Sequence, residues 1–335
     1  MSLLLALTLL APSHLHACAQ AVNSGELMDV VKEEAIIVWD PQTETEHFIR
    51  KAAFAGAQKD FGFLVPTPTR PTLSETDDAV FAQAAEAARP TRIPIPYSAW
   101  WAVIGRGFDY FMAMVSGGAA SMGSDDGGVE LVETKTVADL EAAILKADDH
   151  SALVDWLKEH QYQSRPALAE WLRYYTEHGW YITAFKISPI ANTLAETKAV
   201  RLSFKTPQPF FPYREPADQR DVNRGGRLLN LYVIAPGKAR ASLGTRRWHG
   251  TVEYSAPLRR RIDGIDVPEQ AWLTAFSDRS EPRPGIDEVF INTERWSLPV
   301  NVVMYDPVAV LMPLELIPLA ALAVVLYRRR KRKAG

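Results

Sequence analysis

The stretch Ala35-Ile36-Ile37-Val38-Trp39-Asp40-Pro41-Gln42-Thr43 and the segment after it, Glu44 to Lys51, decide the fold class. The five apolar residues that open the stretch are typical of a β-strand. The next four residues, Asp40 to Thr43, have the composition of a turn. Residues 44–51 are therefore predicted to return as a second strand, and together they form a β-hairpin.

More β structure is predicted immediately downstream of this hairpin. Phe61, Phe63 and Val65 alternate along one face of a strand. The proline-rich run at residues 66–71 must then leave the sheet, because proline cannot donate a hydrogen bond to the ladder. A short helix is expected at residues 79–89, capped by Asp77 or Asp78 and followed by Pro90.

The middle of the chain is predicted to be helical after a strand at residues 130–136. Thr136 and Asp139 resemble a capping box for a helix at residues 137–147. A second helix places Leu153, Trp156 and Leu157 on one apolar face, which we assign to the core. A third helix begins at Pro166 and ends at Gly179.

The remaining residues up to about 300 return to short β runs separated by Pro, Gly and Asp. The predicted strands are 181–187, 200–204, 228–235, 248–254 and 289–292. The fold class predicted is therefore α+β: a β-rich ectodomain with a helical middle segment, plus one C-terminal transmembrane helix.

Several segments together resemble a known bacterial family. They are Phe61-Gly62-Phe63-Leu64-Val65-Pro66-Thr67-Pro68, the later Leu153-Val154-Asp155-Trp156-Leu157, and Phe210-Phe211-Pro212-Tyr213-Arg214. In this order they resemble the bacterial domain-of-unknown-function family 2330, over most of residues 18–240. The resemblance implies an exported, often membrane-anchored protein, and it implies no particular chemistry.

The N-terminus has the pattern of a secretory signal peptide. Leu3 to Ala11 is a short apolar run, and small residues follow it at Ala17 and Ala19. Three alternatives remain open for Cys18: it is removed with the signal, it becomes a lipidated first residue, or it stays a free thiol.

The C-terminus is predicted to anchor the chain. Residues 308–327 form an apolar run with a single charge, Glu315, long enough as a helix to cross a bilayer. Six consecutive cations, Arg328 to Lys333, follow it and favour a cytoplasmic tail at residues 328–335. Glu315 either reaches toward the headgroups or contacts another membrane helix.

These features divide the chain into predicted parts. Residues 1–19 are the signal peptide, and residues 20–128 are a β-rich part with an aromatic insertion and a glycine-rich loop. Residues 129–300 are the helical segment and the second β-rich part, before the span and tail. The insertion packs on the core, contacts the membrane interface or covers a ligand cleft through Trp100, Trp101, Phe108, Tyr110 and Phe111.

Composition excludes several classes of protein. The chain has 335 residues, one cysteine and a net charge of −3, so no internal disulfide forms and a nucleic-acid partner is not expected. No metal-ligand spacing, nucleophile elbow or phosphate loop is present, so no cofactor, metal site or catalytic residue is predicted. The sequence does not favour an enzyme.

The sequence therefore predicts a function only as a class. We expect a single-pass protein of the bacterial cytoplasmic membrane, mostly extracytoplasmic, with a binding or scaffolding role at the cell envelope. Its expected partners are the bilayer, through residues 308–327, and an envelope protein. One alternative is an exported hydrolase with a dispersed site near His47 or His249. The other is an accessory subunit of a membrane complex that uses Glu315.

Overall fold

The computed structural model of the chain divides into two compact units, which are considered separately. One unit combines residues 1–89 with 119–300, and the other combines residues 90–118 with 301–335. The structure describes residues 19–22, 29–55, 61–98, 131–138, 140–147, 149–162, 165–187, 194–220, 228–295, 297–310, 324–325 and 329.

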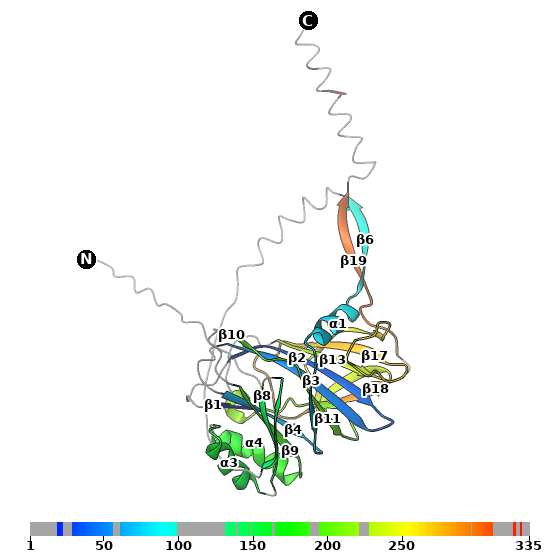
Figure 1. Ribbon diagram of the computed structural model, residues 1–335. Helices are drawn as coiled ribbons and strands as arrows, with labels where there is room; N and C mark the ends of the chain where they lie inside the picture. The colour runs from blue at the N-terminus through cyan, green and yellow to red at the C-terminus, as the bar shows by residue number, and fades with distance from the viewer. Residues whose placement is uncertain are drawn as a thin grey trace, which may run out of the picture. The chain divides into compact units, whose positions relative to one another are not determined.

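The predicted hairpin is confirmed and lies inside the largest sheet (Figure 1). It consists of β2 (Asp29–Asp40) and β3 (Thr45–Ala55), which pair antiparallel. Asp40 organises the turn, since its Oδ1 accepts a hydrogen bond from Gln42 N at 2.9 Å and its Oδ2 accepts one from Thr43 Oγ1 at 2.7 Å. The turn chemistry recognised in the sequence thus acts as expected.

The hairpin is extended on both sides into an eight-stranded sheet. On one side β13 pairs with β2 in parallel, and β17 and β16 follow; on the other side β11 and β5 continue from β3, which also pairs with β10. The added strands are β5 (Thr72–Glu75), β10 (Leu194–Glu196), β11 (Val200–Lys205), β13 (Leu228–Ala235), β16 (Thr251–Pro257) and β17 (Trp272–Asp278).

Two smaller sheets complete the strands of this unit. A five-stranded sheet has the order β1-β4-β9-β8-β7, and a four-stranded sheet has the order β12-β18-β14-β15. Their strands are β1 (Ala19–Val22), β4 (Phe61–Thr67), β7 (Leu131–Val137), β8 (Leu140–Lys146), β9 (Tyr181–Ile187), β12 (Phe210–Phe211), β14 (Lys238–Leu243), β15 (Arg246–Arg247) and β18 (Val289–Glu294).

Helices cover the outer faces of these sheets. The helix α1 (Ala79–Ala87) packs on the eight-stranded sheet through Val80, Phe81 and Ala84. Two longer helices, α3 (His150–Glu159) and α4 (Pro166–Glu177), pack on the five-stranded sheet. A single turn of helix, α5 (Ala217–Arg220), follows β12.

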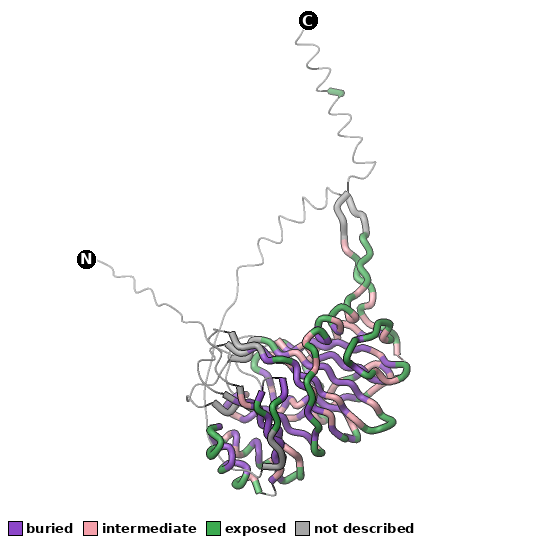
Figure 2. Tube along the Cα trace, viewed as in Figure 1, coloured by how far each residue is buried: buried purple, intermediate pink, exposed green. Residues whose placement is uncertain are grey.

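The central core lies between the eight-stranded sheet and the two smaller sheets. It joins Ile37 and Phe48 of the largest sheet to Phe63 of the five-stranded sheet and to Phe211 and Ile291 of the four-stranded sheet. Figure 2 shows buried residues along the strands of these sheets. Because three sheets share one core, residues far apart in sequence meet at their contact.

One of the three predicted central helices is wrong. The segment expected to be a helix at residues 137–147 contains β8, while the other two predicted helices correspond to α3 and α4. Leu140, Ala142 and Ile144 face the central core, whereas Ala143 and Leu145 face α3 and α4. A strand buried on both faces is a continuous apolar run, which periodicity cannot distinguish from a buried helix.

The second unit contains a parallel two-stranded ribbon, β6 (Thr91–Ser98) paired with β19 (Val303–Val310). The transmembrane helix predicted at residues 308–327 is therefore wrong, since residues 308–310 belong to a strand. In the described part of the chain, no helix has both the length and the apolar character needed to cross a membrane. Valine-rich apolar runs also suit strands, and here eight residues pair with β6.

Candidate functional site

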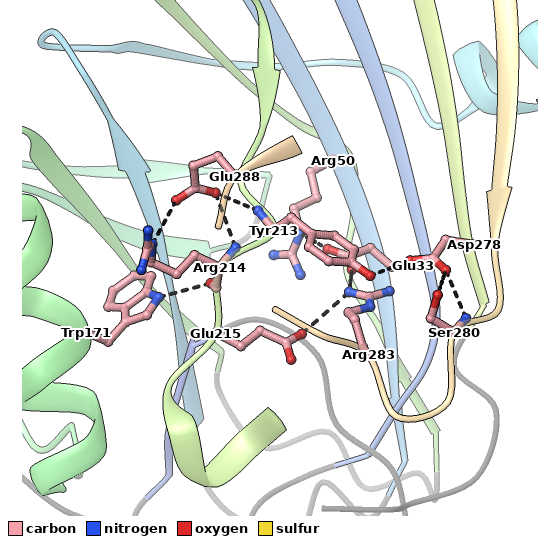
Figure 3. A network of polar contacts seen from close by, with 10 residues as sticks. All are labelled: Glu33, Arg50, Trp171, Tyr213, Arg214, Glu215, Asp278, Ser280, Arg283 and Glu288. Atoms are coloured by element: carbon pink, nitrogen blue, oxygen red, sulfur yellow. Dashed lines mark hydrogen bonds and ion pairs between the residues drawn. The ribbon is translucent and has the colours of Figure 1, made fainter. Parts of the chain in front are cut away.

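The first polar assembly in the larger unit is a buried cluster of charges (Figure 3). Glu33 on β2 accepts a hydrogen bond from Arg50 Nε on β3, with its Oε1 at 2.9 Å. The second oxygen of Glu33 lies 3.3 Å from Arg283 Nη1, which also lies 3.5 Å from Glu215 Oε1. Each of these four residues is buried, so the charges interact in a medium that screens them poorly.

Asp278, at the end of β17, joins this cluster through hydrogen bonds. Its Oδ2 accepts from Tyr213 Oη at 2.6 Å and its Oδ1 accepts from Ser280 N at 2.8 Å. Burial opposes ionisation of Asp278, but Arg283 and the hydrogen bonds from Ser280 and Tyr213 outweigh burial and lower its pKa. Asp278 is therefore an ionised carboxylate that holds the β17–β18 connection.

Glu288 forms a second centre beside the first. Its Oε2 accepts hydrogen bonds from Tyr213 N at 2.7 Å and Arg214 N at 3.2 Å, and its Oε1 accepts one from Tyr175 Oη on α4. Burial raises the pKa of Glu288, and the three hydrogen bonds and Arg214 only partly offset it. Trp171, also on α4, donates from Nε1 to Arg214 O at 2.9 Å, so the segment after β12 is tied to the helix.

The cavity beside this cluster is too small for an organic ligand. It has a volume of about 10 Å³ and is lined by Glu33, Arg50, Trp171, Arg214 and neighbouring apolar residues. That volume corresponds to about one water molecule. The charges face one another rather than an opening, so we interpret the cluster as a clamp between layers and not as a binding site.

The second polar assembly surrounds an open pocket of about 250 Å³ between the C-terminal end of α3 and the five-stranded sheet. Its floor includes Ala143 and the side-by-side pair Glu141 and Lys186, which are partners in the β8–β9 register. The wall comes from the end of α3 and the residues after it. These are Trp156, Glu159, His160, Gln161 and Tyr162.

Aromatic contacts fix the shape of this wall. The His160 ring stacks on Trp156 with centroids 3.7 Å apart, and His160 Nδ1 lies 2.9 Å from Trp156 O. The Tyr162 ring lies over Gly62 of β4, where an added Cβ would come within 2.4 Å of Tyr162 Cε1. A side chain at position 62 would therefore collide with the Tyr162 ring.

Two largely buried aromatic residues that carry polar groups line the pocket. Trp156 is 8% exposed and Tyr162 is 6% exposed. Within the described ranges, neither the indole N–H of Trp156 nor the hydroxyl of Tyr162 has a hydrogen-bond partner. Burial, with the nearby Glu141 carboxylate, raises the pKa of Tyr162, so its hydroxyl keeps its proton. Neither atom is among the buried polar atoms that lack a partner, so both reach solvent, and a ligand in the pocket can take the place of water at them.

A third feature is a pair of residues across β3 and β11. His47 Nδ1 lies 2.7 Å from Ser203 Oγ, and both residues are half-buried. Burial and Arg201 lower the pKa of His47, against a smaller opposing effect of Asp266 and Asp40. A neutral imidazole next to a hydroxyl is the arrangement of a base with a nucleophile. His47 lines neither of the two cavities described above.

None of the candidate site residues predicted from the sequence is among the described residues that line the pocket. Cys18, Glu315 and the aromatic residues of the insertion lie outside the described residues; the last are Trp100, Trp101, Phe108, Tyr110 and Phe111. The apolar spacing of Trp156 on its helix predicts a core residue and gives no sign of a pocket. Tyr162 reaches the pocket from a loop, and Glu141 lies beside Lys186 through strand pairing. Both positions depend on tertiary contacts, so no local sequence signal could have identified these residues.

These features define a class of protein: a layered β-rich domain with a helical outer layer, an internal charge clamp and an open polar pocket. The chain belongs to the family described as "uncharacterized protein conserved in bacteria (DUF2330)", whose model matches residues 12–275. The resemblance to this family seen in the sequence is thus confirmed.

Comparisons with other proteins add little to this assignment. Baculovirus P35 in its crystal structure is 8% identical with a TM-score of 0.43, covering 82% of this chain and 99% of that chain. A mutated baculovirus P35 after caspase cleavage, at 2.7 Å resolution, is also 8% identical with a TM-score of 0.33, covering 79% and 99%. Scores this low carry no argument about function. A comparison with curated proteins gives no significant match.

Proposed function

We propose that this protein is a binding protein of the bacterial cell envelope and that it holds a small polar ligand in the pocket between α3 and the five-stranded sheet. The observation that carries the proposal is the open pocket of about 250 Å³ lined by Trp156 and Tyr162, whose indole N–H and hydroxyl have no hydrogen-bond partner among the described residues. A concave site with a few convergent polar groups is the usual form of a small-molecule site.

The envelope location is supported by the sequence. Leu3 to Ala11 and the small residues after this run have the pattern of an export signal, which would carry the folded part out of the cytoplasm. A cysteine at the exposed position Glu269, in a Cys18→Ala background, tests this location. In intact cells, a membrane-impermeant thiol reagent should label it. Labelling that occurs only after lysis would contradict export.

Binding in the pocket is tested with the full chain carrying ¹⁵N-labelled tryptophan. The indole N–H resonance of Trp156, assigned with Trp156→Phe, is followed during titration with three compounds of similar size: glucosamine, glucose and glucuronate. A saturable shift of the Trp156 resonance with any of them supports the proposal. The absence of a shift with all three, up to concentrations near solubility, would overturn it.

A second candidate function, an exported hydrolase, is favoured by the His47–Ser203 pair. The 2.7 Å contact places a hydroxyl within reach of an imidazole base. Treatment with a fluorophosphonate probe tests it directly, because such probes bond covalently to activated serines. Labelling that Ser203→Ala and His47→Gln both abolish would support a hydrolase, and an unlabelled protein would eliminate this candidate.

A further inference from the structure

We propose that the pocket selects a small organic cation, an amine that carries a hydrogen-bond acceptor such as a hydroxyl close to its nitrogen. This inference rests on the proposed binding function and specifies its ligand class. The evidence is the charge around the pocket, the polarity of the unpaired groups and the aromatic wall.

The acidic groups of the pocket lack partners among the residues that the structure describes. Glu141 and Glu159 both line the pocket, and neither carboxylate forms an ion pair or hydrogen bond with another described residue. Lys186 is the one fixed cation among the described residues that line the pocket, so these side chains together carry a net negative charge. A ligand ammonium would neutralise this excess and donate charge-assisted hydrogen bonds to the carboxylates.

The end of α3 adds to the negative potential. The helix ends at Glu159, with His160 as its C-cap, and these two residues and the preceding Trp156 line the pocket. A helix C-terminus carries a partial negative charge from its last carbonyl groups, which favours a cation nearby. The helix end and the two carboxylates therefore act in the same direction.

The donors of the pocket require an acceptor on the same ligand. The indole N–H of Trp156 can only donate, and the Lys186 ammonium likewise can only donate. A simple alkylammonium would offer neither of them an acceptor. An amine with a neighbouring hydroxyl or carbonyl matches the two sets of groups, with its nitrogen toward the carboxylates and its oxygen toward Trp156 and Lys186.

The aromatic wall and the volume agree with this ligand. The Trp156 and Tyr162 ring centroids lie 6.0 Å apart, and both rings line the pocket. The Trp156 ring is stacked against His160, so these rings offer apolar contact to the carbon atoms of a ligand rather than a free face for its cation. A volume of about 250 Å³ suits a molecule the size of a monosaccharide or an amino acid. A free amine and a lysine side chain of another protein share the ammonium group, but the lysine side chain lacks the neighbouring acceptor, so the experiment distinguishes them.

Isothermal titration calorimetry of the full chain tests the ligand class with matched probes. Glucosamine and N-acetylglucosamine share a ring, but acetylation removes the positive charge. Nα-acetyl-lysine methylamide represents a protein side chain. We expect glucosamine to bind at least about tenfold more tightly than its acetylated form, from the usual free energy of a hydrogen bond to a charged group. Tighter binding of the lysine derivative would overturn the requirement for a neighbouring acceptor and assign the site to a partner protein's side chain.

Two variants with the same change of charge make the test specific. Glu141→Gln should weaken glucosamine binding about tenfold, whereas Glu269→Gln, an exposed change in the β16–β17 connection, should leave it unchanged. Equal binding of glucosamine and N-acetylglucosamine, or an unchanged affinity in Glu141→Gln, would overturn the cation inference while leaving the pocket a binding site. If neither these compounds nor glucuronate binds, both proposals fail.

Discussion

At the scale of single residues, the charge cluster shows what the sequence could not reveal. Glu33 and Arg283 are separated by most of the chain and meet only because β2 and the β17–β18 connection share one core. Nothing in the local sequence marks either residue as buried, since charged residues are usually exposed. Their roles therefore depend on packing and not on a motif.

Removal of Arg283 should destabilise the fold strongly. The variant Arg283→Met leaves the buried carboxylates of Glu33 and Glu215 without this partner, and such losses typically cost about 3–5 kcal/mol. Arg173→Met is the control, because Arg173 pairs with Glu170 and Glu177 on an exposed helix surface, where a pair contributes about 1 kcal/mol or less. Urea unfolding measures both, and equal losses would show that the cluster is no clamp.

Glu46 should make the stability of the protein depend on pH. Its side chain is fully buried, and only Oε2 accepts a hydrogen bond, from Phe210 N at 3.0 Å, while Oε1 has no partner among the described residues. Burial raises the pKa of Glu46 well above its ordinary value. The folded state therefore binds a proton that the unfolded state releases, so stability is full below the ordinary pKa and falls as pH rises.

The variant Glu46→Gln tests this pH dependence. Glutamine has nearly the same shape and stays neutral, so the variant should lose less stability than the native chain between about pH 5 and about pH 8. The free energy of unfolding from urea titrations at both pH values gives the comparison, with Glu269→Gln as an exposed control. A decline as steep in Glu46→Gln as in the native chain would contradict the account.

At the scale of elements, the hairpin and the two helices α3 and α4 could be predicted, whereas β8 could not. The hairpin carries its own turn residues, and α4 carries Pro166 at its start and Gly179, with a φ of 68°, just beyond its end. These signals act locally. The segment of β8 is apolar on both faces because two cores enclose it, and its apparent capping residues suggested a helix.

Gly62 on β4 should tolerate no side chain. An added Cβ would lie 2.4 Å from Tyr162 Cε1 and 2.8 Å from Phe185 O, so a ring and a backbone atom would have to move. Gly62→Ala should reduce the free energy of unfolding by about 1–3 kcal/mol, as overpacking usually does. In a Tyr162→Ala background the added cost should be smaller. An equal cost in both backgrounds would show that the Tyr162 ring does not press on Gly62.

At the scale of the whole molecule, the sequence separated a β-rich body from its ends but misjudged the segment after residue 300. Val303 to Val310 pair with a strand more than 200 residues earlier, which local hydropathy cannot reveal. Arg92 and Asp306 also form an ion pair across this ribbon at 3.0 Å. The position of the apolar run was visible in the sequence, and its strand partner was not.

The ribbon can be tested by cross-linking. Thr91 and Val303 are partners in the register, so cysteines at these positions in a Cys18→Ala background should form a disulfide on mild oxidation. The shifted pair of cysteines at Thr91 and Tyr305 should cross-link less. Proteolysis followed by mass spectrometry quantifies both. A higher yield from the shifted pair would contradict the parallel register.

The central claim is that the pocket beside α3 binds a small amine, and the most direct measurement is the intermolecular nuclear Overhauser effect between bound glucosamine and the protein. The account predicts contacts from ligand protons to the ring protons of Trp156 and Tyr162, which line the pocket. These contacts should weaken in Glu141→Gln. Bound ligand that shows contacts to other aromatic residues and none to these two rings would contradict it.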